Sequence, residues 1–423
     1  MGKSIKVLLL TITCLLGVKA RIWTTDLVNS DHIYVDYVKT VTFHQTGLPL
    51  TLPIVMGQGS LTFAFDDING GSTRYKYYIE HCDRFWQASN LSPNDYLDGF
   101  DEDNLRQVDF SVGTYQDYSH YTLVLPNNVT RWTKSGNYLL HIFDEASGEP
   151  VITRRFGVAD IKLSPTLYFR RPVNTLIDQT HQSFEVAIDI KDFNLSNPLQ
   201  DVSIQVIQNC RWQFITSPKP PNFIRGTEVV FLDNGQLTLP GGKEFRTLDI
   251  RSLRARTVNV EAIEVQPDGV VVFVEPEPLR ATRNYIYIID GNGAFVIENK
   301  DRPGNPQLTC DYAHVNFLLQ SSKELDQDIY LLGGFNHWEC LEEDRLRYKP
   351  EDGGYVIEKL LKQGYYNYAF AMKDEKTGQP NYSKTEGDSY ETENNYTVLI
   401  YYHPIGARYD QLIGLRTFNS LKP

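Results

Sequence analysis

Three adjacent side chains in the first third of the chain have the types needed for covalent catalysis. His81, Cys82 and Asp83 place a base, a thiol and a carboxylate in consecutive positions. A nucleophile and its base must lie within hydrogen-bonding distance of each other. Residues 75–80 alternate between apolar and polar types, which is typical of a strand, and adjacent side chains of a strand point to opposite faces. The pattern therefore favours a packed structural loop over a catalytic pair.

A group of carboxylates lies on the loop that follows. Asp98, Asp101, Glu102 and Asp103 supply oxygen atoms of the kind that bind calcium. Leu105, however, stands where a third alternating oxygen ligand would fall, so the spacing does not match a calcium loop. We expect a solvated acidic loop, and the sequence predicts no metal or cofactor site.

The rest of the chain contains no recognised catalytic signature. It has no Gly-x-Ser-x-Gly elbow, no His-Glu-x-x-His pair, no Cys-x-x-Cys pair and no phosphate-binding glycine loop. The sequence therefore predicts that the protein is not an enzyme. A hydrolase with unrecognised residues stays open as an alternative, and it would require a deep pocket with His81 or His120 beside a nucleophile or a carboxylate.

The composition indicates which elements position these residues. Aromatic residues make up 12% of the 423 residues, with 26 Tyr and 21 Phe, and these are strand formers. Short segments with a period of two recur along the chain, and no segment keeps a helical period over three turns. The sequence predicts an all-β protein of tandem immunoglobulin-like and early-set β-sandwich domains.

The strand patterns fall into three groups, each separated from the next by a loop. We expect an immunoglobulin-like sandwich in 21–160 and a second sandwich in 161–303, whose strands include the run 284–289. A Pro- and Gly-containing linker at 299–306 precedes an early-set-like sandwich in 304–423.

The N-terminus reads as a secretory signal peptide in 1–20. Lys3 and Lys6 precede an apolar run, and small residues end at Ala20. The net charge is −12 for the whole chain, and removing Lys3, Lys6 and Lys19 gives −15. Such a chain repels phosphate groups and anionic lipids, so we expect no nucleic-acid partner and no direct membrane binding.

Four cysteines would remain after cleavage, namely Cys82, Cys210, Cys310 and Cys340. Cys310 and Cys340 are the pair expected within one predicted domain, so theirs is the one disulfide to consider in an oxidising compartment. Buried free thiols are the open alternative.

The third group of strands contains a distinctive turn. Residues 333–338 read Gly-Gly-Phe-Asn-His-Trp, and this Gly-x-Phe-Asn-x-Trp element resembles glycogen-binding early-set domains. In carbohydrate-binding members of that group, exposed tryptophans stack on sugar rings. Trp338 is accordingly a candidate for glycan stacking or, alternatively, a core residue behind a tight turn. An exported glycan-binding protein is the alternative function.

A distinctive set of motifs runs through the segment 75–100 and the residues after it. These motifs are Ile79-Glu80-His81-Cys82-Asp83, Trp86, Ser89, Leu91-Ser92-Pro93, Tyr96-Leu97-Asp98-Gly99-Phe100, Tyr115, Tyr118, His120-Tyr121, Pro126, Lys134-Ser135-Gly136-Asn137-Tyr138 and Thr153-Arg154-Arg155-Phe156. Together they resemble the plug proteins of the type IX secretion system of Bacteroidota. The resemblance is dense in the first predicted domain, whereas the middle domain matches mainly by layout.

The resemblance implies a periplasmic protein that docks on the outer-membrane translocon barrel and closes its periplasmic entrance. It implies no catalytic residues, and it implies attachment to the membrane only through the translocon. We expect a monomer on its own, with Trp86 and Phe100 buried in the first domain. The candidate structural and interaction residues are His81, Cys82, Trp86, Tyr96, Asp98, Gly99 and Phe100.

Overall fold

The computed structural model describes residues 27–193, 195–233, 235 and 237–421. The predicted signal peptide lies outside the described residues. The fold is all-β, as the sequence predicts, and its helices are single turns. These are α1 (Pro93–Tyr96), α2 (Pro198–Asp201), α3 (Pro306–Thr309) and the 3₁₀ turns η1 (Trp212–Phe214), η2 (Gly334–Asn336), η3 (Glu342–Asp344) and η4 (Pro350–Asp352).

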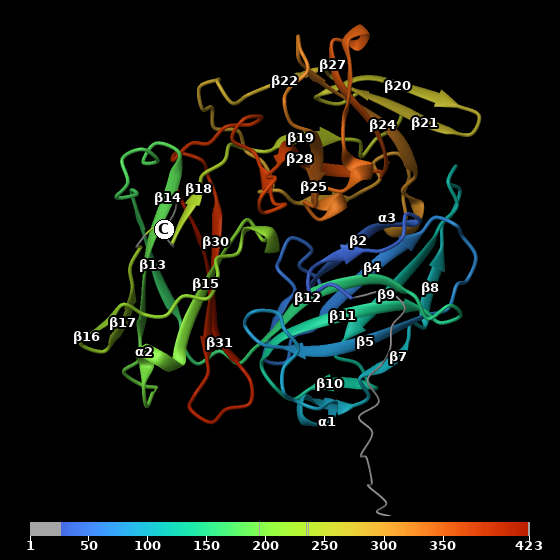
Figure 1. Cartoon of the computed structure of the whole chain (residues 1–423). Helices are drawn as coiled ribbons and strands as arrows, with labels where there is room; N and C mark the ends of the chain where they lie inside the picture. The colour runs from blue at the N-terminus through green and yellow to red at the C-terminus, as the bar shows by residue number, and fades with distance from the viewer. Residues whose placement is uncertain (1–26, 194, 234, 236, 422–423) are drawn as a thin grey trace, which may run out of the picture.

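The first sandwich packs the sheet β1-β12-β11-β5-β7, with β3 beside β12, against the sheet β2-β4-β9-β8. The pair β6-β10 closes one end (Figure 1). Aromatic rings fill the core, where Phe65 stacks on Tyr121 with ring centroids 5.1 Å apart. The strands are β1 (His32–Ile33), β2 (Val38–Gln45), β3 (Ile54–Met56), β4 (Leu61–Asp67), β5 (Tyr75–Cys82), β6 (Leu97–Gly99), β7 (Glu102–Asn104), β8 (Gln107–Phe110), β9 (Ser119–Leu125), β10 (Thr130–Trp132), β11 (Gly136–Asp144) and β12 (Pro150–Ala159).

The second sandwich is built from two distant parts of the chain. One sheet runs β13-β14-β17-β16, with β18 beside β14, and the other runs β15-β30-β31. Their facing apolar side chains form one core. The strands are β13 (Pro165–Arg170), β14 (His181–Asp189), β15 (Val202–Gln208), β16 (Phe223–Arg225), β17 (Glu228–Phe231), β18 (Thr238–Pro240), β30 (Asn395–Tyr402) and β31 (Gln411–Asn419).

The third sandwich lies between these two parts in the sequence. Its sheets are β19-β28-β23, with β25 and β29 beside β28, and β20-β21-β24-β27-β26, with β22 beside β24. The strands are β19 (Arg246–Asp249), β20 (Val260–Gln266), β21 (Gly269–Val274), β22 (Glu277–Pro278), β23 (Phe295–Ile297), β24 (Tyr312–Gln320), β25 (Ile329–Gly333), β26 (Arg347–Lys349), β27 (Gly354–Lys362), β28 (Gly364–Lys373) and β29 (Pro380–Asn381).

The predicted boundary at residue 303 is therefore wrong. β15 pairs with β30 from Val202↔Tyr402 to Gln208↔Tyr396, so the middle sandwich needs the end of the chain. β19, β20 and β21 belong instead to the third sandwich, because their apolar side chains join the core of β24, β27 and β28. The first boundary, near residue 160, coincides with the end of β12.

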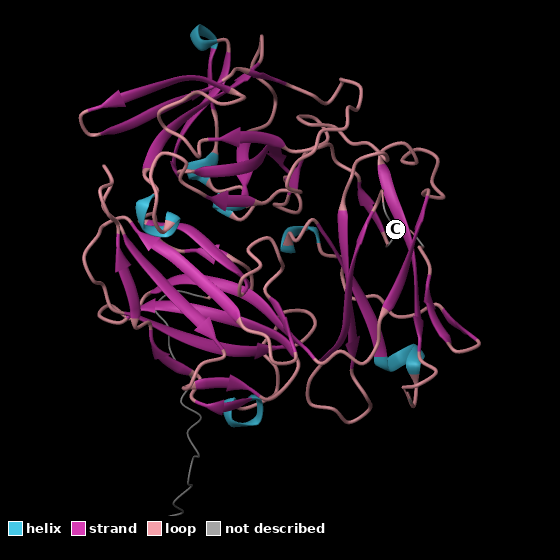
Figure 2. Ribbon diagram, turned by 180° about the vertical axis from the view of Figure 1, so that it is seen from behind, coloured by secondary structure: helices cyan, strands magenta, loops and turns pink. Residues whose placement is uncertain are grey.

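The three sandwiches meet at a common junction. Figure 1 shows the first sandwich, in blue to green, below the third, while the second stands beside both and contains the C-terminus. Figure 2 shows the same arrangement of the three sandwiches from behind. The connection from the first to the second sandwich is held by β31, since the backbone N–H groups of Asp160, Lys162 and Leu163 donate to carbonyl groups of that strand. The predicted strand at 284–289 is absent, and these residues form a loop.

Candidate functional site at the domain junction

The end of β5 holds His81 inside an aromatic cluster. Its Nδ1 accepts from the Ser89 hydroxyl at 2.9 Å, and its Nε2 donates to the Ser135 carbonyl oxygen at 3.3 Å. The ring contacts Tyr96 and Tyr138. Burial lowers the pKa of His81 to about 4, so the ring is neutral at pH 7.

Cys82 points to the opposite side of the same strand. Its thiol joins an apolar cluster with Trp86 and Leu139, whereas His81 packs against aromatic residues of the sandwich core. Burial raises the pKa of Cys82 well above its usual value, which disfavours the thiolate. Asp83 caps the next turn, because its Oδ1 accepts from the backbone N–H groups of Phe85 and Gln87. His81 and Cys82 therefore face opposite sides of β5, as the alternation predicts.

Trp86 joins the first sandwich to the second. The turn after β5 gives it a φ of 65°, and its backbone N–H donates to the Asp83 carbonyl oxygen at 3.0 Å. The indole is 5% exposed and packs edge-on against Trp212, with ring centroids 5.0 Å apart. The Arg155 guanidinium lies 5.1 Å from the Trp86 ring. The predicted burial of Trp86 is confirmed, and its contacts reach across two sandwiches.

The remaining residues of the motif lie at the end of the first sandwich. Tyr96 is buried and donates to the Ile79 carbonyl oxygen at 3.1 Å. Gly99 has a φ of 110°, and a Cβ there would lie 1.9 Å from the Val129 carbonyl oxygen, so only glycine fits. Phe100 is 70% exposed, which corrects the prediction that it is buried. Phe100 directly follows β6, and its backbone N–H donates to the Val129 carbonyl oxygen at 2.9 Å while its ring stays exposed.

Asp98 is exposed on the same two-stranded sheet. Its carboxylate accepts from the Arg131 guanidinium at 2.7 Å, and both side chains are more than half exposed. Such an ion pair contributes little to stability. Within the described residues, no group of three or more His, Cys, Asp and Glu side chains is arranged to hold a metal ion.

Trp338 lies inside the junction and does not present its ring for stacking on a sugar. It is 4% exposed and packs against Phe245, with ring centroids 5.1 Å apart. The Arg211 guanidinium lies 4.9 Å from the Trp338 ring and 4.3 Å from Phe214. The tight turn after β25 directs the indole inward, so the glycan-stacking prediction for Trp338 is corrected.

Arg211 connects the second and third sandwiches through this ring of aromatic side chains. It is 8% exposed, and burial lowers the pKa of Arg211. Its Nε has no hydrogen-bond partner among the described residues, so the cation is held mainly by the aromatic faces. The sequence did not single out Arg211, since the rings that surround it come from four separate segments.

A buried ion pair joins the first and third sandwiches. The Lys362 ammonium donates to Asp66 Oδ2 at 2.6 Å, and both side chains are fully buried. The Tyr312 hydroxyl donates to the same oxygen at 2.7 Å, and His120 Nδ1 lies 2.7 Å from Asp66 Oδ1. The Lys362 ammonium also lies 4.0 Å from the Tyr118 ring. Asp66 and His120 come from the first sandwich, and Lys362 and Tyr312 from the third.

The charges in this network compensate each other. Burial alone would raise the pKa of Asp66, but Lys362 and His120 lower it below its usual value, so the carboxylate stays ionised. Removing one member would leave the other charge buried and unpaired. The pair therefore favours a fixed placement of the first sandwich on the third.

The loop after β8 adds further contacts between the same two sandwiches. The Asp311 carboxylate accepts from the backbone N–H groups of Tyr115 and Gln116. The Tyr118 hydroxyl donates to the carbonyl oxygen of Cys310 at 2.9 Å, and the Val112 N–H donates to that of Leu308. These bonds hold the start of β24 against the first sandwich.

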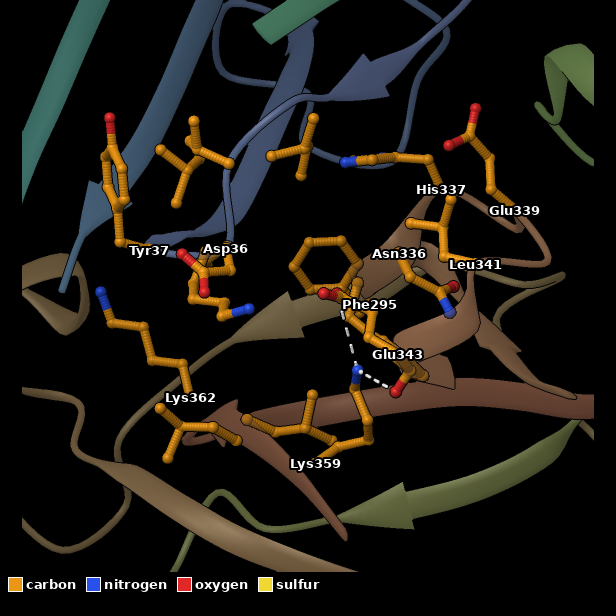
Figure 3. Close-up of a pocket in the computed structure, with 18 of the residues that line it drawn as sticks. Asp36, Tyr37, Phe295, Asn336, His337, Glu339, Leu341, Glu343, Lys359 and Lys362 are labelled. Atoms are coloured by element: carbon orange, nitrogen blue, oxygen red, sulfur yellow. Dashed lines mark hydrogen bonds and ion pairs between the residues drawn. The ribbon is translucent and has the colours of Figure 1, made fainter. Parts of the chain in front are cut away.

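A cavity of about 550 Å³ lies between the first and third sandwiches, next to Lys362. Residues 33–40 line one side and the third sandwich lines the other, with Phe295 and Lys359 among the side chains that face it (Figure 3). The Lys359 ammonium lies 3.8 Å from Glu343 Oε1. Lysine and carboxylate side chains line the cavity together with apolar residues.

The four cysteines in the described part of the chain are free thiols. Of the two alternatives for Cys310 and Cys340, a disulfide or free thiols, the structure therefore shows free thiols. Burial raises the pKa of Cys310 to about 12 and that of Cys340 to about 11. No helix among the described residues is long and apolar enough to cross a membrane.

Comparison with known proteins tests the resemblance to the plug family. Residues 38–160 match the family model of the type 9 secretion system plug protein 1st domain. The resemblance to the plug family is confirmed. The matched range coincides with the first sandwich, which contains His81, Trp86 and the Tyr96–Phe100 motif. The plug-family match associates the chain with type 9 secretion.

The architecture of the whole chain also occurs in a solved structure. A hypothetical protein from Parabacteroides merdae ATCC 43184 is 29% identical with a TM-score of 0.87, over 93% of this chain and 100% of that one. The C-terminal domain of the Streptococcus pyogenes antigen I/II-family protein AspA is 6% identical over 91% of this chain and 99% of its own, and its TM-score of 0.16 supports no argument. No curated protein matches the sequence.

Proposed function

We propose that this protein is a non-enzymatic plug that binds the outer-membrane translocon of the type 9 secretion system from the periplasmic side and closes its entrance. The plug-family match over residues 38–160 carries the proposal. Closing a wide aqueous pore requires a body of fixed shape more than it requires a pocket. The buried contacts among the three sandwiches supply such a body.

The junction is the structural support for this role. The Asp66–Lys362 pair fixes the first sandwich to the third, and Trp86 with Trp212 fixes it to the second. Arg211 completes the junction between the second and third sandwiches. Because all three pairs of sandwiches share buried side chains, independent hinge motion would expose charged or aromatic groups to water at a cost in free energy.

The two alternatives receive less support from the geometry. Trp338 is buried, so the feature that suggested glycan stacking is absent from the surface. His120 lies beside the Asp66 carboxylate, but His120 is 6% exposed and Asp66 is fully buried, which denies a substrate access to the pair. The net charge of −12 favours docking on a basic partner surface, and such docking weakens as salt increases.

Outer-membrane permeability tests the proposal. Deleting the gene should admit a large antibiotic such as vancomycin, and expression of the wild-type chain should restore the barrier. The same deletion in a strain that lacks the translocon barrel should have no such effect. Equal sensitisation of both strains would show that the protein acts elsewhere.

A matched pair of variants tests whether a fixed shape is needed. Lys362→Met removes the buried cation, whereas Lys384→Met removes a lysine that is 60% exposed and 3.8 Å from Asp326. We expect only Lys362→Met, at equal protein levels, to fail to restore the barrier. Full restoration by Lys362→Met would contradict the need for a rigid junction.

A further inference from the structure

The loop between β22 and β23 contains an apolar segment that the fold leaves without a partner. Ile286, Tyr287, Ile288 and Ile289 are 72%, 50%, 48% and 80% exposed. Aromatic and β-branched residues of this kind favour strands, and the sequence predicts one here. In the described structure, residues 284–289 belong to no sheet, and no hydrogen bond joins their backbone groups to the rest of the chain. All six keep a negative φ, which is compatible with strand pairing.

Both ends of the segment are anchored. The Tyr285 hydroxyl donates to Glu244 Oε1 at 2.5 Å, and the Lys243 ammonium donates to the Arg283 carbonyl oxygen at 2.7 Å. Beyond the other end, the Asp290 carboxylate accepts from two backbone N–H groups. The segment is therefore held at the surface in a defined place, which reduces the entropy lost when a partner binds it.

We propose that residues 285–289 are a docking edge, that is, an extended segment that adds as a strand to an exposed sheet edge of the translocon. This inference rests on the proposed function and names the surface that the plug uses. Strand addition would satisfy the free backbone groups, and the apolar side chains would enter pockets of the partner. Alternate side chains of a strand face opposite sides, so Ile286 and Ile288 would share one face.

The small size of the segment favours the translocon over a second copy of this chain. Exposed side chains of both signs lie near the segment, with Arg283 at its start and Glu391 close to Tyr285. The four exposed side chains offer only a few hundred Å², less than the roughly 800 Å² per partner of a stable dimer. On a translocon, the remaining plug surface would supply the rest of the contact.

Binding of the full-length protein to purified translocon barrel tests this docking edge. Ile286→Asp/Ile288→Asp places two charges on the segment, and Val173→Asp/Leu176→Asp is the matched control on two residues that are each 89% exposed in the second sandwich. We expect the first variant to weaken binding by about tenfold or more and the control by less than about twofold. Unchanged thermal unfolding of both variants will show that they fold. A photocrosslinker at position 287 should react with the barrel protein.

Three results would overturn the inference. Equal affinity of the two double variants for the barrel would place the contact elsewhere on the protein. The plug proposal itself would stand as long as the wild-type protein binds the barrel. Dimerisation of the wild-type protein in sedimentation, abolished by Ile286→Asp/Ile288→Asp, would identify a second copy as the occupant. Absence of wild-type binding to the barrel would refute the proposed function and, with it, this docking edge.

Discussion

Protonation of His81 should destabilise the protein as the pH falls. In the folded state its Nδ1 accepts from Ser89 and its Nε2 donates to Ser135, an arrangement that fits the neutral ring. Burial lowers the pKa of His81 to about 4, from 6.5 in the unfolded chain. The unfolded chain therefore binds a proton before the folded one does, so this stabilisation is complete above pH 6.5 and is lost toward pH 4. At about 1.4 kcal/mol per pH unit, the loss approaches about 3 kcal/mol.

Urea unfolding of the wild-type protein and His81→Gln between pH 7 and pH 4 measures this effect. Glutamine stays neutral, so the stability advantage of the wild type over the variant should shrink by about 3 kcal/mol across that range. The comparison with a variant is needed because His337 is also buried beside Arg154, which lowers its pKa, and it contributes to the same wild-type loss. His314→Gln, at a half-exposed histidine, serves as the matched control for replacing a histidine by glutamine. Parallel curves for the wild type and His81→Gln would refute the reasoning.

Three further predictions concern the first sandwich and its junction. Trp86→Ala should lower the free energy of unfolding by about 3–5 kcal/mol, while Phe100→Ala, at an exposed ring, should change it by less than about 1 kcal/mol in urea unfolding. Lys362→Met should cost about 3–5 kcal/mol, and adding Asp66→Asn should recover much of this in a double-mutant cycle; no recovery would exclude the ion pair as the cause. Gly99→Ala should lower the melting temperature measured by circular dichroism, because its Cβ meets a backbone carbonyl group; an unchanged temperature would contradict this.

The sequence predicts local structure well and the pairing of distant strands poorly. Alternation before His81 identifies β5, and the turn residues after it explain why Trp86 points back into the protein. By contrast, nothing near Val202 shows that its strand pairs with Tyr402. Consecutive strands with similar patterns look like one domain, even where an insertion separates the two halves of a sandwich. For this reason the boundary at 160 agrees with the structure and the one at 303 does not.

The candidate site shows the same limit. Tyr96 and Gly99 lie in a motif whose local geometry explains them. Phe100 was expected inside because it is large and apolar, but an edge position allows a large ring to remain exposed. Asp66 and Lys362 are 296 residues apart, and each is an ordinary charged residue until the fold brings them together. The sequence predicts a strand at 284–289, but these residues form a loop, because no strand among the described residues pairs with them.

The pairing of β15 with β30 constrains the order in which the chain can fold. The first sandwich contains only residues before 160, so it can fold before the rest of the chain is available. The second sandwich must wait for Asn395–Asn419, and until then β15 keeps an unpaired edge and an uncovered apolar face. A chain that is truncated before β30 would therefore carry a half-formed sandwich with an exposed apolar face next to an intact first sandwich, which makes it a target for chaperones and proteases. The second sandwich can therefore complete its core only when the C-terminal strands β30 and β31 are present.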